Sequence, residues 1–189
     1  MSAVKPSRFD LPDFESLPDD LKQRMLAVQE KAGFIPNVFL ALSHRPDEFR
    51  AFFAYHDTLM EKDEGLSKAE REMIVVTTSA LNSCLYCVVA HGAILRIRKK
   101  NALIADQLAT NYRKADLSER ERTMLDFAVK VSQSSHLVCG EDFEALEKAG
   151  FSNDEIWDIG AISGLFALSN RLANLASIMP NLEFYSMGR

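Results

Sequence analysis

Hydrophobic side chains recur every three or four residues along most of this chain, and no segment alternates strictly between polar and apolar positions. The stretch from Phe49 to Met60 shows the pattern clearly. At about 100° per residue, Phe49, Phe52, Phe53 and Met60 share one face of a helix. The chain is therefore predicted to be all-α, without a convincing β-strand.

Capping signals set the expected ends of these helices. Ser67 and Ser118 each precede a glutamate by three residues, which is the pattern of a capping box, and residues 152–155 are expected to open the last helix. Glycine and proline are expected just beyond the last turn of a helix. These signals predict eight or nine helices, over residues 18–32, 38–42, 46–64, 67–81, 84–99, 101–112, 118–133, 141–148 and 152–179.

The length of 189 residues suits one well-filled hydrophobic core and is short for two. Residues 1–17 contain Pro6 and Pro12 and have mixed polarity, so they are predicted to form an extended arm on the surface or on a neighbouring subunit. Residues 18–189 are predicted to form a single helical domain.

A short internal similarity occurs at an offset of 51 residues, where residues 70–74 resemble residues 121–125. The same offset places Ser135 opposite Cys84 and Val138 opposite Cys87. A degenerate helical repeat that has lost its chemistry in the second copy is one interpretation. Chance similarity over so few residues is the other.

Charge and composition exclude several classes of function. The net charge is −5 with acidic and basic residues interleaved, and the only basic run, residues 96–100, is expected at a helix end. The N-terminus lacks the apolar core of a secretory signal, and no stretch approaches the roughly 18 apolar residues of a membrane span. We therefore expect a cytoplasmic protein that binds neither nucleic acid nor membrane.

Residues 84–91 carry the clearest chemical signal. Cys84 and Cys87 are three positions apart and His91 follows four positions later, so on a helix all three fall within roughly 60° of one another. Only a thiolate attacks peroxides or disulfides, and a helix N-terminus capped by residues 82–83, together with His91, would lower the pKa of a thiol there. The Cα atoms of such a pair lie about 5 Å apart, inside the range of a reversible disulfide. These residues predict a redox or peroxide-reducing site.

Glu72 precedes Cys84 by twelve residues. On one straight helix it would lie about 18 Å away and about 120° around the axis, too far for contact. It reaches the cysteines only if the chain turns near residues 81–83, where the capping signals independently predict a break between two helices.

The spacing of these residues resembles the signature of the alkylhydroperoxidase D-like branch of the carboxymuconolactone decarboxylase superfamily: Glu72-x11-Cys84-x2-Cys87-x3-His91. The context around the cysteines is similar to that of the peroxidase-related subgroup. Further stretches resemble the same subgroup, so the similarity covers roughly residues 20–178: residues 35–39, 44–46, 66–72, 149–152 and 170–174.

This resemblance implies an AhpD-like all-helical domain, often homo-oligomeric, that reduces hydroperoxides without haem, metal or another cofactor. Cys87 would attack the peroxide, and Cys84 would be the more accessible resolving partner. Glu72 and His91 would form a proton relay through water. An external dithiol, of a lipoyl-type or thioredoxin-like protein, would reduce the resulting disulfide.

Two further residues are candidate auxiliaries. Tyr86 stands where the best-known members of the family have a relay histidine, and a phenol with a pKa near 10 is a poor base at neutral pH. His56 lies among the phenylalanines of its helix, where a packed histidine is the alternative to a second base. Cys139, His44 and His136 are interpreted as core or loop residues.

Other interpretations of the motif stay open at this point. The two cysteines and His91 could bind zinc, although a closed structural site would need a fourth ligand from elsewhere. They could also pack in a helix interface, because free cysteine is often buried. With the chemistry changed, the protein could be a dithiol redox sensor in a homo-oligomer, or a lyase like the namesake of the superfamily, whose members generally lack the cysteine pair.

Overall fold

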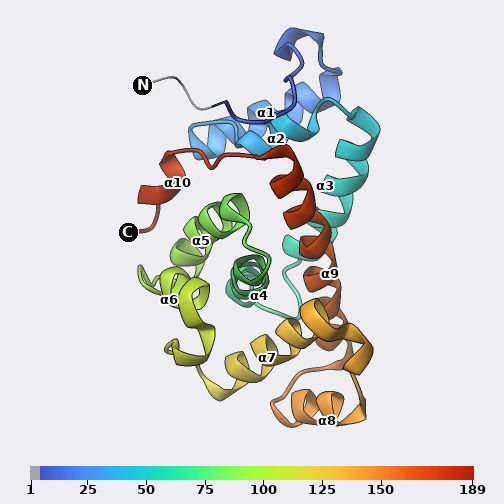
Figure 1. The fold of residues 1–189 in the computed structure, drawn as a ribbon, viewed down its shortest axis with the longest axis vertical. Helices are drawn as coiled ribbons and strands as arrows, with labels where there is room; N and C mark the ends of the chain where they lie inside the picture. The colour runs from blue at the N-terminus through green and yellow to red at the C-terminus, as the bar shows by residue number, and fades with distance from the viewer. Residues whose placement is uncertain (1–4) are drawn as a thin grey trace.

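The computed structural model describes residues 5–189, and all of its regular structure is helical (Figure 1). The prediction of an all-α protein is confirmed. Ten α-helices lie within the described residues: α1 (Asp19–Ala32), α2 (Asn37–Leu42), α3 (Pro46–Met60), α4 (Lys68–Leu81), α5 (Leu85–Lys99), α6 (Ile104–Asn111), α7 (Glu119–Ser134), α8 (Gly140–Lys148), α9 (Asn153–Ala176) and α10 (Glu183–Ser186). Three short 3-10 helices accompany them: η1 (Phe14–Ser16), η2 (Tyr112–Lys114) and η3 (Ser135–Leu137).

Helix α4 lies at the centre, surrounded by α5, α6, α7 and α9 (Figure 1). Its middle section is buried on every side, and residues 73–76 have no exposed surface. A helix that is apolar all round belongs inside a protein, which is where the run Met-Ile-Val-Val places it. This central position matters because α4 also carries Glu72.

The third helix ends earlier than predicted. Helix α3 stops at Met60, not just before Gly65, because the fully buried Arg71 of α4 holds the following segment as a loop. Its guanidinium donates hydrogen bonds to the carbonyl oxygens of Leu59 and Glu64 at 2.7 and 2.8 Å. Those carbonyls therefore have partners without a further turn of helix.

The C-terminal region differs from the prediction in two ways. Helix α9 ends at Ala176 because Ser177 has a left-handed φ of 52°, so the helix does not continue to residue 179. The four-residue helix α10 was not predicted, since so short a segment shows no period. It packs on α5 through Arg96, which donates hydrogen bonds to the carbonyl oxygens of Phe184 and Met187.

Part of the predicted N-terminal arm lies against α9 of the same chain, and its first four residues lie outside the described part. The amide of Arg8 donates to the carbonyl of Ala176 at 2.7 Å, and the amide of Met179 donates to the carbonyl of Pro6 at 3.1 Å. Helices α1 to α3 share a hydrophobic cluster, in which Phe39 of α2 stacks on Phe53 of α3 at a ring-centroid distance of 4.3 Å.

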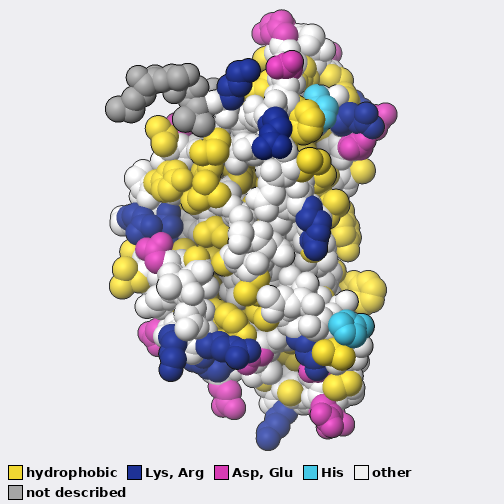
Figure 2. Space-filling view, viewed as in Figure 1, with side chains coloured by type: hydrophobic (Ala, Val, Ile, Leu, Met, Phe, Trp, Pro, Cys, Tyr) yellow, Lys and Arg dark blue, Asp and Glu magenta, His cyan; other side chains and the backbone are white. Residues whose placement is uncertain are grey.

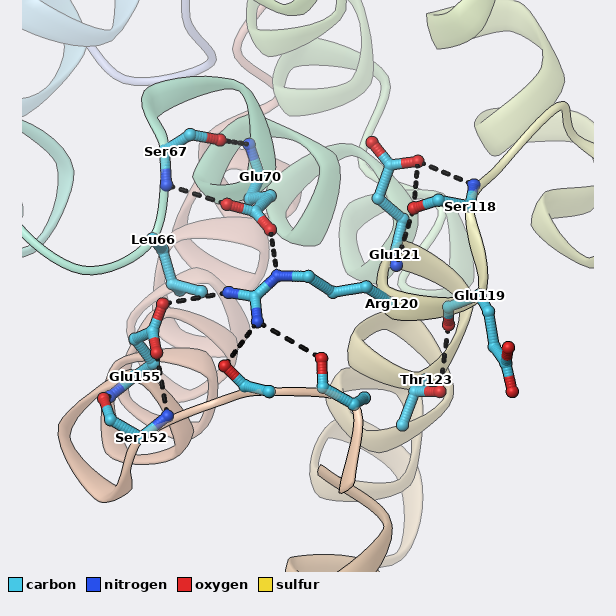
Figure 3. A network of polar contacts seen from close by, with 12 residues as sticks. Leu66, Ser67, Glu70, Ser118, Glu119, Arg120, Glu121, Thr123, Ser152 and Glu155 are labelled. Atoms are coloured by element: carbon cyan, nitrogen blue, oxygen red, sulfur yellow. Dashed lines mark hydrogen bonds and ion pairs between the residues drawn. The ribbon is translucent and has the colours of Figure 1, made fainter. Parts of the chain in front are cut away.

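The N-termini of α4, α7 and α9 meet around one arginine (Figure 3). Both predicted capping boxes are present, and Ser152 forms a third with Glu155. Arg120 donates to the capping-box carboxylates Glu70 and Glu155 at 3.1 and 2.9 Å, and to the carbonyl of Gly150 at 2.8 Å. Its guanidinium also lies 3.6 Å from the ring centroid of Phe151. One cation therefore neutralises the acidic caps of two helices and belongs to a third.

The surface carries mixed charge. On the face shown in Figure 2, acidic, basic and hydrophobic side chains lie next to one another. Among residues 5–189, no helix has both the length and the apolar character needed to cross a membrane.

Candidate active site

The turn between α4 and α5 positions the cysteines. Ser83 adopts a left-handed φ of 52°, and the amides of Ser83 and Cys84 donate to the carbonyls of Ala80 and Ser79, both at 3.0 Å. This pair of bonds is the Schellman pattern that ends a helix. The chain reverses within three residues, as the position of Glu72 required.

Cys84 itself caps α5. Its Sγ accepts the amide of Cys87 at 3.4 Å, so the first turn of the helix receives its hydrogen bond from a sulfur atom. The prediction of a cap at residues 82–83 is therefore wrong by one or two positions. The physical reason is that Asn82 and Ser83 form the C-terminal end of α4, so neither is available to cap α5.

The two thiols are free and buried. Cys84 is 1% exposed and Cys87 is 2% exposed, and both pack in a small cluster with Phe34, Tyr86 and Ala173. The greater exposure of Cys84 that the family resemblance implies is absent from this structure. An oxidant therefore has to pass between the surrounding side chains to reach either sulfur atom.

The cysteines have opposite shifts in acidity. The hydrogen bond from the Cys87 thiol, the backbone amide of Cys87 and the charge of a protonated His91 together lower the pKa of Cys84 to about 7, against the effect of burial. The hydrogen bond to Cys84, burial and the negative charge on Cys84 raise the pKa of Cys87 well above its usual range. Near neutral pH Cys87 therefore stays protonated, whereas Cys84, with a pKa of about 7, is ionised in about half of the molecules.

Asn170 is a fully buried amide that supports both thiols. Its side chain donates to Ser79 at 2.9 Å and accepts from Asn82 at 2.9 Å, which fixes its orientation. Hydrogen bonding from Asn170 lowers the pKa of Cys84, after the larger effects of Cys87 and His91. It was not predicted as a site residue. The available signal was an amide at a position where the period of the last long helix calls for an apolar side chain.

Glu72 and His91 form the second part of the site. His91 Nδ1 lies 2.8 Å from Glu72 Oε2, and the two side chains are only 15% and 10% exposed. An ionised carboxylate at this distance requires a proton on Nδ1, which leaves Nε2 as the nitrogen that takes up or gives away a proton. The structure thus brings together all four residues of the predicted motif.

Tyr86 does not act as a base in this site. It is buried, and its hydroxyl oxygen accepts the amide of Val38 on α2 at 3.3 Å. Burial raises the pKa of Tyr86 far above neutral pH, so the side chain stays a neutral phenol. Its visible role is to join α5 to the N-terminal helices.

His56 lies closer to the motif than its place in the sequence suggests. Its ring centroid is 6.5 Å from that of His91, and both rings contact Phe166 of α9. Its Nδ1 lies 3.2 Å from Asp57. The candidate auxiliary therefore belongs to the surroundings of the relay, although it touches neither cysteine.

The remaining candidates lie elsewhere. Cys139 is exposed at the start of α8, and Nδ1 of His44 lies 2.8 Å from the carbonyl of Ala41. His136 lies in η3 and is exposed. Within the part of the chain that the structure describes, no cluster of three or more histidine, cysteine or acidic side chains has a geometry suited to a metal ion.

Comparisons with known proteins give a consistent result. The sequence model of the carboxymuconolactone decarboxylase family matches residues 46–110. The structure is similar to the alkylhydroperoxidase AhpD core of an uncharacterized peroxidase-related protein from Ralstonia eutropha JMP134, with 63% identity over 99% of this chain and 98% of that one, and a TM-score of 0.98. An uncharacterized peroxidase-related protein from Silicibacter sp. TM1040 is 39% identical over 100% of this chain and 99% of its own, with a TM-score of 0.93.

A more distant likeness extends only to the fold. The debrominase Bmp8, solved in complex with 2,3,4-tribromopyrrole, is 20% identical over 94% of this chain and 97% of its own, with a TM-score of 0.75. No curated protein sequence matches the chain significantly.

Proposed function

The chain belongs to the carboxymuconolactone decarboxylase family, in its AhpD-like, peroxidase-related branch, and from this membership we propose that it is a thiol-dependent hydroperoxide reductase. One observation carries the proposal. Two free, buried cysteines lie at the start of α5, the helix that also carries His91, and His91 is hydrogen-bonded to Glu72. A dithiol with one ionised sulfur is what the reduction of a peroxide by two electrons requires.

The reaction balances with these groups alone. The thiolate attacks the outer oxygen of the hydroperoxide, the O–O bond breaks, and protonated His91 gives a proton to the departing alkoxide. The attacking cysteine becomes a sulfenic acid. The thiol of the other cysteine then displaces water and closes the disulfide. In sum, one thiolate, one thiol, one proton and the hydroperoxide give a disulfide, an alcohol and water.

The two sulfur atoms can be assigned distinct roles. The family resemblance assigns the attack to Cys87. The amide hydrogen bond to Cys84 Sγ and the lowered pKa of Cys84 favour that residue as the resting thiolate. We assign the first attack to Cys84 and the resolving step to Cys87.

An external dithiol completes the cycle. It attacks the Cys84–Cys87 disulfide and leaves oxidised, which restores the thiol and the thiolate and releases one proton. A lipoyl-type or thioredoxin-like protein is the class of reductant that the family membership favours. That reductant, a homo-oligomeric assembly and a cytoplasmic location stay predictions.

Stopped-flow mixing with peroxide tests the proposal. We expect reduced protein to lose two thiols per molecule of hydrogen peroxide or cumene hydroperoxide, with a Cys84–Cys87 bridge identified by mass spectrometry. Cys84→Ser should abolish the fast phase. Cys87→Ser should consume one peroxide and stop at a sulfenic acid on Cys84 that dimedone traps. A sulfenic acid found instead on Cys87 of the Cys84→Ser variant would reverse the roles.

Cys139→Ser is the matched control, because it removes the third, exposed cysteine and should change nothing. Wild-type thiols that react no faster than free cysteine would contradict the proposal. Formation of the disulfide with slow peroxide turnover, together with changed assembly, would instead indicate a dithiol sensor. Turnover of a carboxylated lactone by a double cysteine variant would indicate a lyase.

A further inference from the structure

Two histidine–carboxylate pairs pack next to each other against Phe166. The first is His91 with Glu72, and the second is His56 with Asp57 at 3.2 Å. The ring centroid of Phe166 is 4.8 Å from that of His91 and 6.3 Å from that of His56. The second pair comes from α3, which is far from the cysteine motif in sequence.

The exposure of these side chains falls steadily toward the cysteines. Asp57 is 40% exposed, His56 is 21% exposed, His91 is 15% exposed and Glu72 is 10% exposed. Both cysteines are nearly inaccessible. The four side chains therefore form a graded series of titratable groups between solvent and a buried site.

The proposed reaction needs such a connection, and the inference rests on that proposed function. When Cys84 is ionised, oxidation of the pair consumes one proton, and reduction of the disulfide by a dithiol back to one thiol and one thiolate releases one. His91 and Glu72 can store that proton beside the sulfur atoms. His91 and Glu72 are 15% and 10% exposed, whereas His56 and Asp57 are 21% and 40% exposed, so the second pair is the more accessible to bulk water.

We propose that His56, oriented by Asp57, exchanges protons between solvent and His91 and so supplies the proton that each turnover of the dithiol requires. His56 acts through His91 and touches neither cysteine.

The geometry between the two rings fits transfer through one water molecule. The two centroids are 6.5 Å apart and no direct hydrogen bond joins the rings. Two successive hydrogen bonds through water span about 5.6 Å. In each pair the carboxylate lies against Nδ1, which leaves both Nε2 atoms free to exchange protons.

The groups that face His56 keep its partner ionised. Arg24 of α1 donates two hydrogen bonds of 2.9 Å to Asp57. The hydrogen bond from His56, followed by that from Arg24, holds the pKa of Asp57 well below its usual range. The His56 ring also packs against the aromatic rings of Phe52, Phe53 and Phe166.

His56→Phe removes both ring nitrogens and keeps an aromatic side chain among phenylalanines. We would mix reduced protein with hydrogen peroxide in weakly buffered solution, with a pH indicator, and follow proton uptake and thiol loss together. We expect the proton-linked phase of His56→Phe to be at least about tenfold slower than wild type. Imidazole or a higher buffer concentration should restore it.

Two further variants complete the design. His44→Phe is the matched control, since His44 also stacks on an aromatic ring, that of Phe9, and lies outside the series; its rate should equal wild type. His56→Gln, which keeps a polar side chain but cannot carry a proton, should behave like His56→Phe.

A wild-type rate in His56→Phe at low buffer would overturn the inference. So would a loss of rate that imidazole does not restore in a protein with an unchanged melting temperature, because that result indicates a packing role. Reduction of the disulfide by dithiothreitol, followed by proton release, separates the two proposals. If peroxide does not react but this reduction shows the same dependence on His56 and imidazole, the peroxidase proposal fails and the proton route stands.

Discussion

Cys84 has two structural roles at once: it caps α5 through its sulfur, and the same sulfur carries the negative charge of the dithiol. A capping atom normally accepts one amide of the first turn, and the positive end of the helix dipole favours an anion there. The hydrogen bond from the Cys87 amide therefore stabilises the thiolate more than the thiol. The hydrogen bond that caps α5 is therefore also one of those that lower the pKa of Cys84.

The acidity of Cys84 leads to a prediction about pH. Since its pKa is lowered to about 7, the thiolate ultraviolet absorbance of reduced Cys139→Ser protein should rise through a midpoint near pH 7. An ordinary cysteine titrates near about 8.5. Below the midpoint the reactive fraction, and with it the rate with peroxide, should fall about tenfold per pH unit. Cys84→Ser should lose this step, and a midpoint near 8.5 would contradict the assignment.

Asn170 should tune that acidity. Asn170→Ala removes a hydrogen bond to the thiolate from a fully buried site, so the pKa of Cys84 should rise. A hydrogen bond to a charged group contributes about 1.5 kcal/mol or more, which corresponds to about one pH unit. The ultraviolet titration measures the shift. Asn174→Ala, one helical turn further along α9 and exposed, is the matched control and should leave the midpoint unchanged. An unshifted midpoint in Asn170→Ala would show that Asn170 only packs there.

The residues that sequence could identify are those whose chemistry depends on spacing. Cys84, Cys87 and His91 are close together in the chain, and Glu72 reaches them through one predictable turn. Asn170 and His56 arrive from α9 and α3, and only packing of those helices brings them to α5. The residue that caps α5 was also not predicted correctly. Asn82, Ser83 and Cys84 all favour non-helical backbone, and the local sequence does not show which of them are needed to end α4.

At the scale of elements, the backbone conformation of Ser83 slightly destabilises the turn between α4 and α5. Its φ of 52° is unfavourable for a residue with a side chain. Ser83→Gly should therefore raise the free energy of unfolding by about 0.5–1 kcal/mol, measured by urea denaturation. Ser135→Gly is the opposite control, because Ser135 has a φ of −54° and glycine should destabilise it by a similar amount. Equal effects at both positions would contradict the argument.

The two segments of the predicted internal similarity each lie at the start of a helix. Helices α4 and α7 both begin with a capping box, at the predicted offset of 51 residues. After these helices the chain diverges, because α4 leads through a tight turn into α5, whereas α7 leads into η3. The hypothesis of a degenerate repeat stays a prediction, because the capping pattern accounts for Glu70 and Glu121 but not for the matching pairs Arg71–Arg122 and Met73–Met124.

At the scale of the whole molecule, local sequence signals predicted where the helices begin and end better than they predicted how the helices pack together. The predicted capping boxes of Ser67 and Ser118 are correct because each depends on residues three positions apart. The loop after α3 is set by Arg71, which contacts backbone in its own neighbourhood and Asp158 on α9. A contact over that sequence distance leaves no trace in the period of the hydrophobic residues.

The meeting point of three helix starts should be a major determinant of global stability. Arg120→Gln would leave Glu70 and Glu155, each only 14% exposed, without their cation, although both keep their capping bonds (Figure 3). We expect a loss of about 1–3 kcal/mol in the free energy of unfolding. Arg113→Gln, whose side chain is 70% exposed and 3.8 Å from Asp126, should cost less than about 0.5 kcal/mol. Because α4 carries Glu72 and α9 carries Asn170, Arg120→Gln should lose peroxide activity on heating in step with its lower melting temperature. Equal stability of the two variants would show that the capping boxes alone hold these helices together.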